Sequence, residues 1–301
     1  MCGGVWSAAP TPFDSKWKID AAGVRRMVEH HFRLGIKGLF LCGTNGEGPC
    51  LTDMQRLEFI RAVVRHVHGR LPVAVQVTDN SSARILENMK AAKAEGADIA
   101  VIAPPYFISN PTSDHLRRIY LDAINRSPLP VGIYDRGKFS PVFVPDLVLR
   151  ELYAHPRVVI AKDSSAVPER MKIALEVKKK RPSFCLLNGD EFHCVPYLKA
   201  GYDGLLLGGG VFNGYLARTI FDAVRAGDLS EAEKLQALMN RLMFAVYGGK
   251  KISCWLAGEK YLLMRLGIFR TYLNYPQYPL SVSCRRAIEK TLRQNRRWLL
   301  P

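Results

Sequence analysis

Lys162 is the residue of this 301-residue sequence whose type and position most directly suggest chemistry. It ends the apolar, largely β-branched run 158–161, and the small polar turn 163–165 follows it. Such a run is typical of a buried parallel strand. Burial disfavours the charged form of an amine, and a neutral amine is a nucleophile for carbonyl carbons. Lys162 therefore predicts Schiff-base chemistry, whereas the competing interpretation is a lysine that ends a strand and extends to solvent.

Other apolar runs also end in side chains or turns that could bind a substrate. Tyr134, Asp135 and Arg136 end one run, and a tyrosine there could relay protons. The remaining turns are 43–48 (Gly-Thr-Asn-Gly-Glu-Gly), 104–107, 188–191 (Asn-Gly-Asp-Glu) and 208–210 (Gly-Gly-Gly). Each has a structural alternative, because glycines satisfy positive φ, a tyrosine packs in cores and an aspartate such as Asp190 caps helices. The run 208–210 could be a phosphate loop or could leave room for a bulky substrate.

These turns belong to a regular alternation of short apolar runs and amphipathic segments. The runs predict strands at 5–9, 38–42, 73–77, 99–103, 131–134, 158–162, 184–188 and 204–207, each followed by a predicted helix. Eight strand–helix units in about 225 residues favour a (β/α)8 TIM barrel over an open doubly wound sheet. A barrel carries its chemistry at the carboxyl ends of its strands. We therefore expect all the turns named above to share one rim.

The segment 228–301 has no strand pattern. It predicts three helices, over 229–247, 252–266 and 281–292, separated by Gly248-Gly249 and a proline-bearing stretch. We expect two regions, a catalytic barrel over 1–227 and a C-terminal helical extension over 228–301. The extension could form an oligomer contact or simply cover the barrel, and the sequence leaves both open.

Composition narrows the class of partner. The net charge is +16, from 43 Lys and Arg against 27 Asp and Glu. This balance would suit nucleic acid, a membrane surface or anionic small molecules. Most basic residues occur singly on predicted amphipathic helices, so we expect a solvated surface, a small anionic substrate and no nucleic-acid partner. No apolar run reaches the roughly 18 residues that a membrane span needs, so we expect no membrane association.

Cysteine and histidine usage bears on compartment and cofactors. The seven cysteines form no Cys-x-x-Cys pair, and residues 1–6 lack the pattern of a signal peptide. We therefore expect reduced thiols and a cytoplasmic protein. The histidines show no metal-ligand spacing, and no Gly-x-Gly-x-x-Gly follows a predicted strand. These patterns predict an enzyme without a metal or nucleotide cofactor.

Taken in order, several of these segments resemble a known family. They are Gly43-Thr-Asn-Gly-Glu47, Tyr134, Ile160-Ala-Lys-Asp-Ser164, Gly189-Asp-Glu191, the opening 7–13 and the Pro279-Leu-Ser281 turn. Together they resemble the dihydrodipicolinate synthase/N-acetylneuraminate lyase family. The resemblance implies a barrel with a C-terminal helical region, a homotetramer built as a dimer of dimers, and class I aldolase-type lyase chemistry. It implies that Lys162 forms an imine with pyruvate or another 2-oxo acid.

The resemblance also assigns roles to the other rim residues. It implies that Tyr134 is the proton relay, and that Thr44 and Asn45 hold the substrate carboxylate and the Tyr134 hydroxyl. The further substrate-binding candidates are Gly43, Asp135, Arg136, Gly189, Asp190, Glu191 and Gly208.

Departures from the synthase pattern bear on the substrate. The arginine that grips the second substrate of the synthase is replaced by Phe139, and the second relay tyrosine is replaced by Phe107 with Tyr106 just before it. These changes favour a lyase or aldolase that cleaves, condenses or dehydrates a 2-oxo-3-deoxy sugar acid. The first alternative is 4-hydroxy-tetrahydrodipicolinate synthase, condensing pyruvate with aspartate semialdehyde. The second, from another class, is a catalytically retired barrel that binds or regulates.

Overall fold

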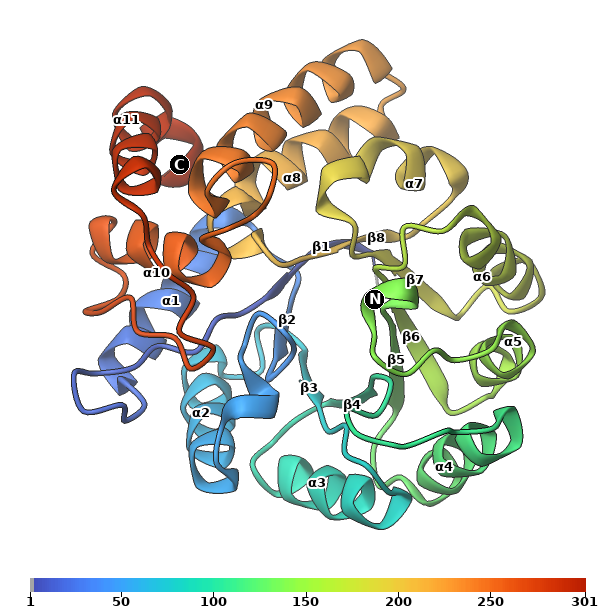
Figure 1. The fold of residues 1–301 in the computed structure, drawn as a ribbon. Coiled ribbons are helices and arrows are strands. Elements are labelled where there is room, and N and C mark those ends of the chain that lie inside the picture. Colours follow the sequence, from blue (N-terminus) through green and yellow to red (C-terminus); the bar gives the residue numbers. More distant parts are fainter. Residues whose placement is uncertain (1–2) are drawn as a thin grey trace.

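The computed structural model describes residues 3–301 as a closed barrel with helices around it (Figure 1). Met1 and Cys2, which open the predicted barrel region, lie outside the described residues. All neighbouring strands are parallel and follow the chain order. The strands are β1 Gly4–Ala8, β2 Gly38–Leu41, β3 Val73–Gln76, β4 Ile99–Ile102, β5 Val131–Asp135, β6 Val158–Asp163, β7 Cys185–Asn188 and β8 Gly204–Leu207. The predicted TIM barrel is confirmed, and every predicted strand is found to within one or two residues of its expected ends.

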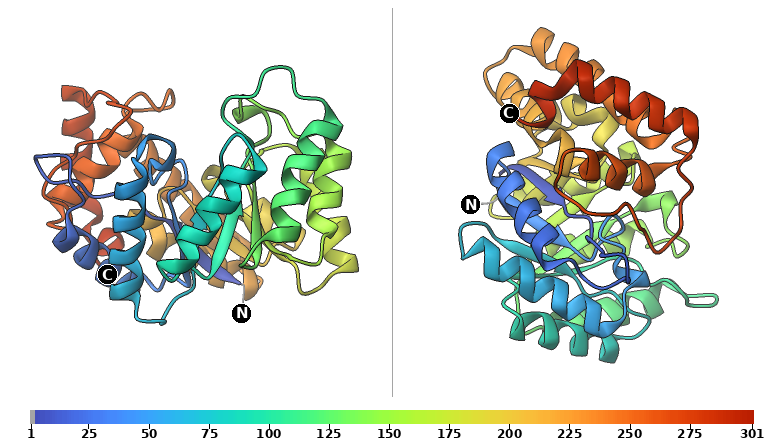
Figure 2. Two further views of the ribbon diagram at one scale, coloured as in Figure 1. Left: turned by 90° about the horizontal axis from the view of Figure 1, so that it is seen from below. Right: turned by 90° about the vertical axis from the view of Figure 1, so that its left-hand side faces the viewer.

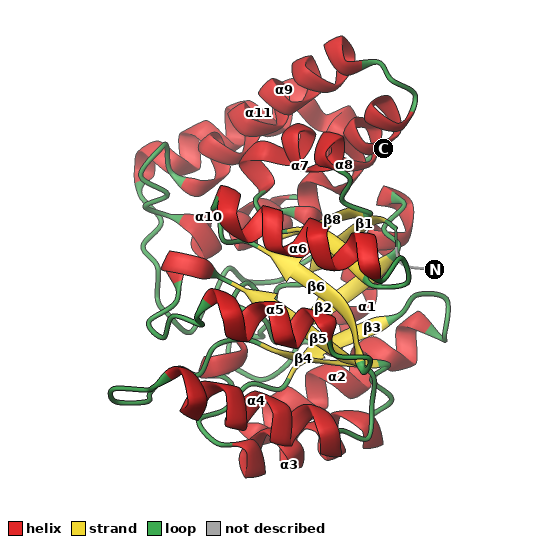
Figure 3. Ribbon diagram, turned by 90° about the vertical axis from the view of Figure 1, so that its right-hand side faces the viewer, coloured by secondary structure: helices red, strands yellow, loops and turns green. Residues whose placement is uncertain are grey.

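Helices separate the strands and cover the outside of the barrel, as Figure 3 shows. The helices between strands are α1 Ala21–Leu34, α2 Asp53–Val67, α3 Ser82–Ala94, α4 Ser113–Arg126, α5 Asp146–Ala154, α6 Pro168–Lys180 and α7 Cys194–Ala200. The later helices are α8 Gly210–Arg225, α9 Leu229–Tyr247, α10 Trp255–Arg265 and α11 Val282–Leu299. Their ends follow local chemistry. Thr52 and Gln55 form a capping box at the start of α2, and Gly248 ends α9 in the left-handed conformation.

The strands bury both of their faces, which explains why their sequences read as continuous apolar runs. One face packs against the helices in the main core. The other face fills the barrel interior with a second cluster that includes Trp6, Phe40, Val101, Ile160 and Leu206. The barrel interior is therefore solid, and the space for a ligand is left at its rim.

The C-terminal helices α9, α10 and α11 lie together on one side of the barrel, beside α8 and α1 (Figures 1 and 2). A fully buried ion pair joins this region to the β2 turn, because Lys260 on α10 contacts the Glu47 carboxylate. Glu47 also accepts a hydrogen bond from the Tyr275 backbone at 2.8 Å. The turn after β2 is thus held from outside the barrel, and the extension supports the rim.

Three helix boundaries differ from prediction by three residues or more. The sequence pattern predicts the helix after β8 over 215–226, but α8 begins at Gly210, because Gly209 and Gly210 allow close packing: a Cβ on Gly210 would lie 2.9 Å from the Ser7 side chain. α10 begins at Trp255, since Ile252 has a left-handed φ of 51°. α11 continues to Leu299, with non-helical angles at Asn295, because the buried Leu299 side chain ties its end to the core.

Among the helices of residues 3–301, none is long and apolar enough to cross a bilayer.

Candidate active site

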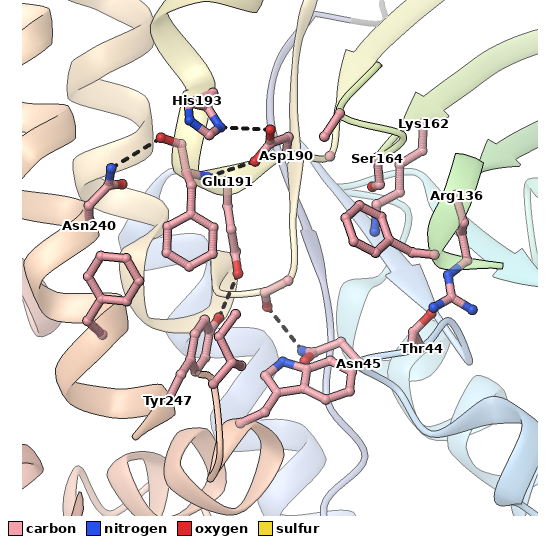
Figure 4. Close-up of a pocket in the computed structure, with 18 of the residues that line it drawn as sticks. Thr44, Asn45, Arg136, Lys162, Ser164, Asp190, Glu191, His193, Asn240 and Tyr247 are labelled. Carbon is pink, nitrogen blue, oxygen red and sulfur yellow. Dashed lines mark hydrogen bonds and ion pairs between the residues drawn. The ribbon is translucent and has the colours of Figure 1, made fainter. Parts of the chain in front are cut away.

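A cavity of ≈ 660 Å³ opens at the carboxyl ends of the strands (Figure 4). Lys162, Ser164, Arg136 and Thr44 lie on one side of it, and Asn240 and Tyr247 lie on the other. The first group comes from turns of the barrel, and the second comes from α9. Most of the predicted rim residues therefore meet at one place.

Lys162 and Tyr134 form the inner end of this cavity. They are register partners on the adjacent strands β6 and β5, so both side chains point to the same face. Lys162 is 7% exposed and Tyr134 is 6% exposed, and the Lys162 Nζ lies 4.4 Å from the centre of the Tyr134 ring. The Phe40 ring lies 5.3 Å from the same nitrogen. The amine is therefore enclosed by aromatic carbon with its one open side toward the cavity.

The electrostatics of this pair favour proton transfer by Tyr134. Burial acts to raise the pKa of Tyr134, but the positive charges of Lys162 and Arg136 and a contact with Thr44 outweigh it. The pKa of Tyr134 consequently lies below its usual value of 10. The Thr44 hydroxyl lies 3.5 Å from the Tyr134 hydroxyl. A phenol so placed gives up its proton more readily than a tyrosine in water, and its pKa lies closer to neutral pH, where a proton relay works best.

Thr44 and Asn45 both line the cavity, as predicted, but their side chains have different partners. The Asn45 amide is buried and donates toward the Ala8 carbonyl at 2.8 Å and the Gly208 carbonyl at 3.0 Å. It also contacts the Glu259 carboxyl on α10 at 2.9 Å. The Asn45 side chain thus holds together the ends of β1, β2 and β8, and the Thr44 hydroxyl is the one that faces Tyr134.

Gly43 does not line the cavity. A Cβ at this position would lie 2.5 Å from the Phe40 ring, so Gly43 permits the close approach of the turn to the aromatic residue beneath Lys162. Its expected contact with a substrate stays a prediction, and its observed role is this packing against Phe40.

The turn after β7 lines the cavity, but its carboxylates are engaged within the protein. Asp190 accepts from the Phe192 backbone at 3.2 Å and pairs with the His193 ring at 2.8 Å. Glu191 accepts from the Gly209 backbone at 2.6 Å and from the Tyr247 hydroxyl at 2.9 Å. Burial raises the pKa of Glu191, although these two hydrogen bonds oppose the shift. Both acids therefore fix the turns that carry Gly189 and Gly208, which also line the cavity.

Asp135 and Arg136 separate at the end of β5. Arg136 lines the cavity. Asp135 is 3% exposed, lies on the opposite face of β5 from Tyr134, accepts from the Gly137 backbone at 2.9 Å and faces buried Arg170 at 3.6 Å. Burial raises the pKa of Asp135 to about 6, against the opposing charge of Arg170. The structure does not bring Asp135 to the predicted site, because alternate residues of a strand point to opposite faces.

Phe139 and Phe107, the two phenylalanines that differ from the synthase pattern, lie in different surroundings. Phe139 lines the cavity and is 55% exposed. Phe107 lies outside the cavity and is 81% exposed. Tyr106 is hydrogen-bonded to Gln76, and burial raises the pKa of Tyr106 to about 12.

The helical extension contributes to the cavity, which the sequence pattern did not predict. Six residues beyond the predicted barrel line it: Phe244, Tyr247 and Trp255 are aromatic, Ile252 is aliphatic, Asn240 is polar and Lys250 is charged. The signal was present in the sequence, because these residues flank the Gly248-Gly249 break between two predicted helices. A break that exposes aromatic residues on both sides is unusual for a segment that only covers a surface.

Comparison with known proteins agrees with this geometry. A model described as the Dihydrodipicolinate synthetase family matches residues 1–295. The 4-hydroxy-tetrahydrodipicolinate synthase of Anaeromyxobacter sp. (strain Fw109-5) is 33% identical over 233 residues, covering 75% of this chain and 77% of that protein. The enzyme of the same name from Methylococcus capsulatus is 28% identical over 289 residues, covering 95% of this chain and 96% of that one.

The solved structure of dihydrodipicolinate synthase from Bacteroides thetaiotaomicron is also similar. It superposes with a TM-score of 0.88 at 28% identity, covering 97% of this chain and 98% of that one.

Proposed function

This chain belongs to the dihydrodipicolinate synthetase family, and from that membership we propose a reaction that runs through an imine on Lys162. The family is one of class I, Schiff-base-forming lyases, and the chain is an enzyme of that general type. The substrate we propose is pyruvate or a larger 2-oxo acid. The observation that carries the proposal is the enclosed Lys162 amine beside Tyr134 at the inner end of the cavity.

In this mechanism the Lys162 nitrogen attacks the ketone carbon of the 2-oxo acid, and water leaves as the imine forms. The protonated imine withdraws electrons, so the bond between the third and fourth carbons breaks and an enamine remains. Tyr134 carries the protons that move in these steps, because its ring lies beside the amine and its pKa is lowered. Protonation of the enamine and hydrolysis of the imine then release pyruvate.

The substrate carboxylate is held at the turn after β2. Within residues 3–301, no acceptor is found for the backbone N–H groups of Thr44 and Asn45, and the Thr44 hydroxyl lies beside them. Backbone donors in such a turn bind anions well. Arg136 adds a positive charge on the same side of the cavity. This arrangement would fix the ketone carbon in front of Lys162. No metal or nucleotide enters the proposed reaction.

A second candidate is 4-hydroxy-tetrahydrodipicolinate synthase itself, which the names of the relatives favour. Phe139 and Phe107 weigh against it, because they stand where the synthase pattern has an arginine and a tyrosine. Phe139 lies in the cavity and offers no charge to a second anionic substrate.

Borohydride trapping with pyruvate, followed by peptide mapping, tests the imine. We expect a reduced adduct on Lys162 and none in Lys162→Ala. Lys138→Ala is the matched control, since Lys138 is an exposed lysine near the cavity that does not line it. A label on another lysine, with Lys162 unmodified, would refute the mechanism.

Two assays separate the candidates. The first measures pyruvate release from 2-oxo-4-hydroxy acids, and the second measures condensation of pyruvate with aspartate semialdehyde. Fast condensation without cleavage would reverse our ranking.

We further propose that the protein works in the cytoplasm and assembles as a homotetramer, as the family resemblance implies. Light scattering of the purified chain measures the assembly, and a monomer at micromolar concentration would exclude it.

A further inference from the structure

The outer part of the cavity has an apolar surface that the imine chemistry does not use. Phe192, Phe244, Trp255, Ile252 and Phe139 line it, and we call these five residues the aromatic wall. Phe192 and Phe244 stack with ring centres 5.1 Å apart and planes 25° apart. Trp255 meets Tyr278 edge to face at 5.4 Å. Two rings of the wall therefore support each other, and a third is supported by Tyr278 behind it.

The amide, carboxylate and imidazole groups beside Phe192 and Phe244 are already hydrogen-bonded within the protein. Asn240 donates to the Phe192 carbonyl at 3.1 Å and accepts from Gln236 at 2.8 Å. Asp190 and His193 pair with each other, and Glu191 pairs with Tyr247 and the Gly209 backbone. A site that binds sugar hydroxyls needs unpaired donors and acceptors, since each hydroxyl removed from water must find a new partner.

The backbone conformation at Ile252 indicates that the surrounding structure fixes this part of the wall in place. Ile252 has φ 51°, which is a rare conformation for a β-branched side chain. Strained residues of this kind persist where the surroundings fix them, and they concentrate at ligand sites. Here the strain follows the Gly248-Gly249 break and places Ile252, 37% exposed, at the cavity mouth.

The position of the wall relative to Lys162 defines which part of a substrate it meets. Lys162 and Thr44 hold the 2-oxo acid end on the barrel side, whereas Tyr247 and Asn240, on the helix that carries Phe244, lie across the cavity (Figure 4). The group on the fourth carbon, which leaves as the aldehyde, therefore faces the wall.

Resting on the proposed imine reaction, we propose that the aldehyde partner of this enzyme is aromatic or similarly apolar and is not a sugar. The substrate class is a 4-hydroxy-2-oxo acid with an aryl group on its fourth carbon. Cleavage of its third-to-fourth carbon bond passes the hydroxyl proton to the enzyme and gives an aryl aldehyde and the enamine. The enzyme then returns that proton to the third carbon, and the water lost in imine formation is regained as the imine is hydrolysed to pyruvate, so atoms and charge balance. Binding of an aryl group against these rings would be favoured both by the apolar area that it buries and by aromatic stacking.

The test compares two substrates with the full-length enzyme. One is 4-hydroxy-2-oxo-4-phenylbutanoate and the other is 2-oxo-3-deoxygluconate, with pyruvate release measured for each. We expect kcat/KM to be higher for the phenyl compound by about 10-fold or more. A higher value for the sugar acid, with pyruvate still trapped on Lys162, overturns this inference and leaves the proposed function intact. If nothing is trapped on Lys162, the proposed function fails and this inference fails with it.

Variants connect the preference to the wall. In Phe244→Ser, we expect kcat/KM for the phenyl substrate to fall about 10-fold or more while pyruvate trapping on Lys162 persists, because the inner end of the cavity is unchanged. Phe221→Ser is the matched control, since Phe221 is a partly buried phenylalanine on α8 outside the cavity. Equal losses in both variants, or an equal loss for both substrates in Phe244→Ser, would contradict the assignment.

Discussion

At the residue scale, the site depends on one amine whose surroundings are almost entirely apolar or aromatic. Lys162 lies against Phe40 and Tyr134, and Gly189 passes so close that a Cβ there would lie 2.8 Å from the Lys162 Cε. Such packing leaves the side chain few rotamers, so its nitrogen is presented in one position. An amine with one position and one open side is prepared for attack on a bound ketone.

Tyr134→Phe removes the proposed proton relay and leaves the amine in place. We expect turnover to fall about 10²- to 10⁴-fold, the usual contribution of a positioned acid–base group. Borohydride should still trap some pyruvate on Lys162, because the attack on the ketone needs the amine itself. Steady-state rates together with the trapped fraction provide the measurement, and wild-type turnover in the variant would remove Tyr134 from the mechanism.

At the element scale, the turns at the strand ends are held mainly by side-chain contacts with other turns and helices. Asn45 ties the ends of β1, β2 and β8, and Glu191 ties the β7 turn to the start of α8 and to α9. Lys260 and Glu47 add a buried ion pair from α10. Loss of any one tie would release a turn that lines the cavity, so the extension helps to keep the site rigid.

Gly189→Ala tests this dependence of the site on a neighbouring turn. The added Cβ would lie 2.0 Å from the Ser164 hydroxyl oxygen and 2.8 Å from the Lys162 Cε. We expect the lysine to be displaced, and a displacement of about 1 Å can cost roughly 10² in rate. Pyruvate trapping and urea unfolding, measured on the same sample, separate a displaced lysine from a loss of fold. Unchanged trapping would show that the turn yields without moving Lys162.

At the scale of the whole molecule, titratable groups buried between the strands and the surrounding helices link stability to pH. His31 is fully buried, and its ring nitrogen lies 2.9 Å from the Ser7 hydroxyl. Burial, with a smaller effect from neighbouring His30, lowers the pKa of His31 to about 3 from 6.5. His31 is therefore neutral in the folded protein, and the unfolded chain binds a proton first as the pH falls.

We expect His31 to reduce stability below pH 6.5. Its folded-state pKa lies below the unfolded value, so its contribution is complete above pH 6.5 and is lost progressively toward pH 3. The loss is about 1.4 kcal/mol per pH unit within that window. Urea unfolding at pH 7 and pH 5 measures it, and in His31→Gln the pH dependence should be weaker by about this slope.

Asp135 has the opposite sign, because its raised pKa of about 6 favours the folded state as the pH falls from 6 toward 3.8. The wild-type protein and the His31→Gln variant both contain Asp135, so the difference between their stability profiles reports on His31 alone. If stability changed with pH in the same way in both proteins, His31 would not be the group responsible.

The sequence by itself determined the barrel and the position of its candidate lysine. Eight apolar runs read as strands buried on both faces, and their strict alternation with eight helices favours a closed parallel sheet, which the structure confirms. The carboxyl ends of such strands meet at one rim, so Lys162, Tyr134 and Thr44 could be placed together without coordinates.

Only the tertiary structure decided which polar residues face the cavity and what forms its outer wall. Asp135 lies on the opposite face of β5 from Tyr134. The side chains of Asp190, Glu191 and Asn45 form hydrogen bonds with neighbouring turns. The aromatic wall came partly from α9 and α10, which are distant from Lys162 in the chain. The physical reason is that strand periodicity is encoded locally, whereas the pairing of side chains across turns and the docking of a helical extension depend on contacts between distant residues.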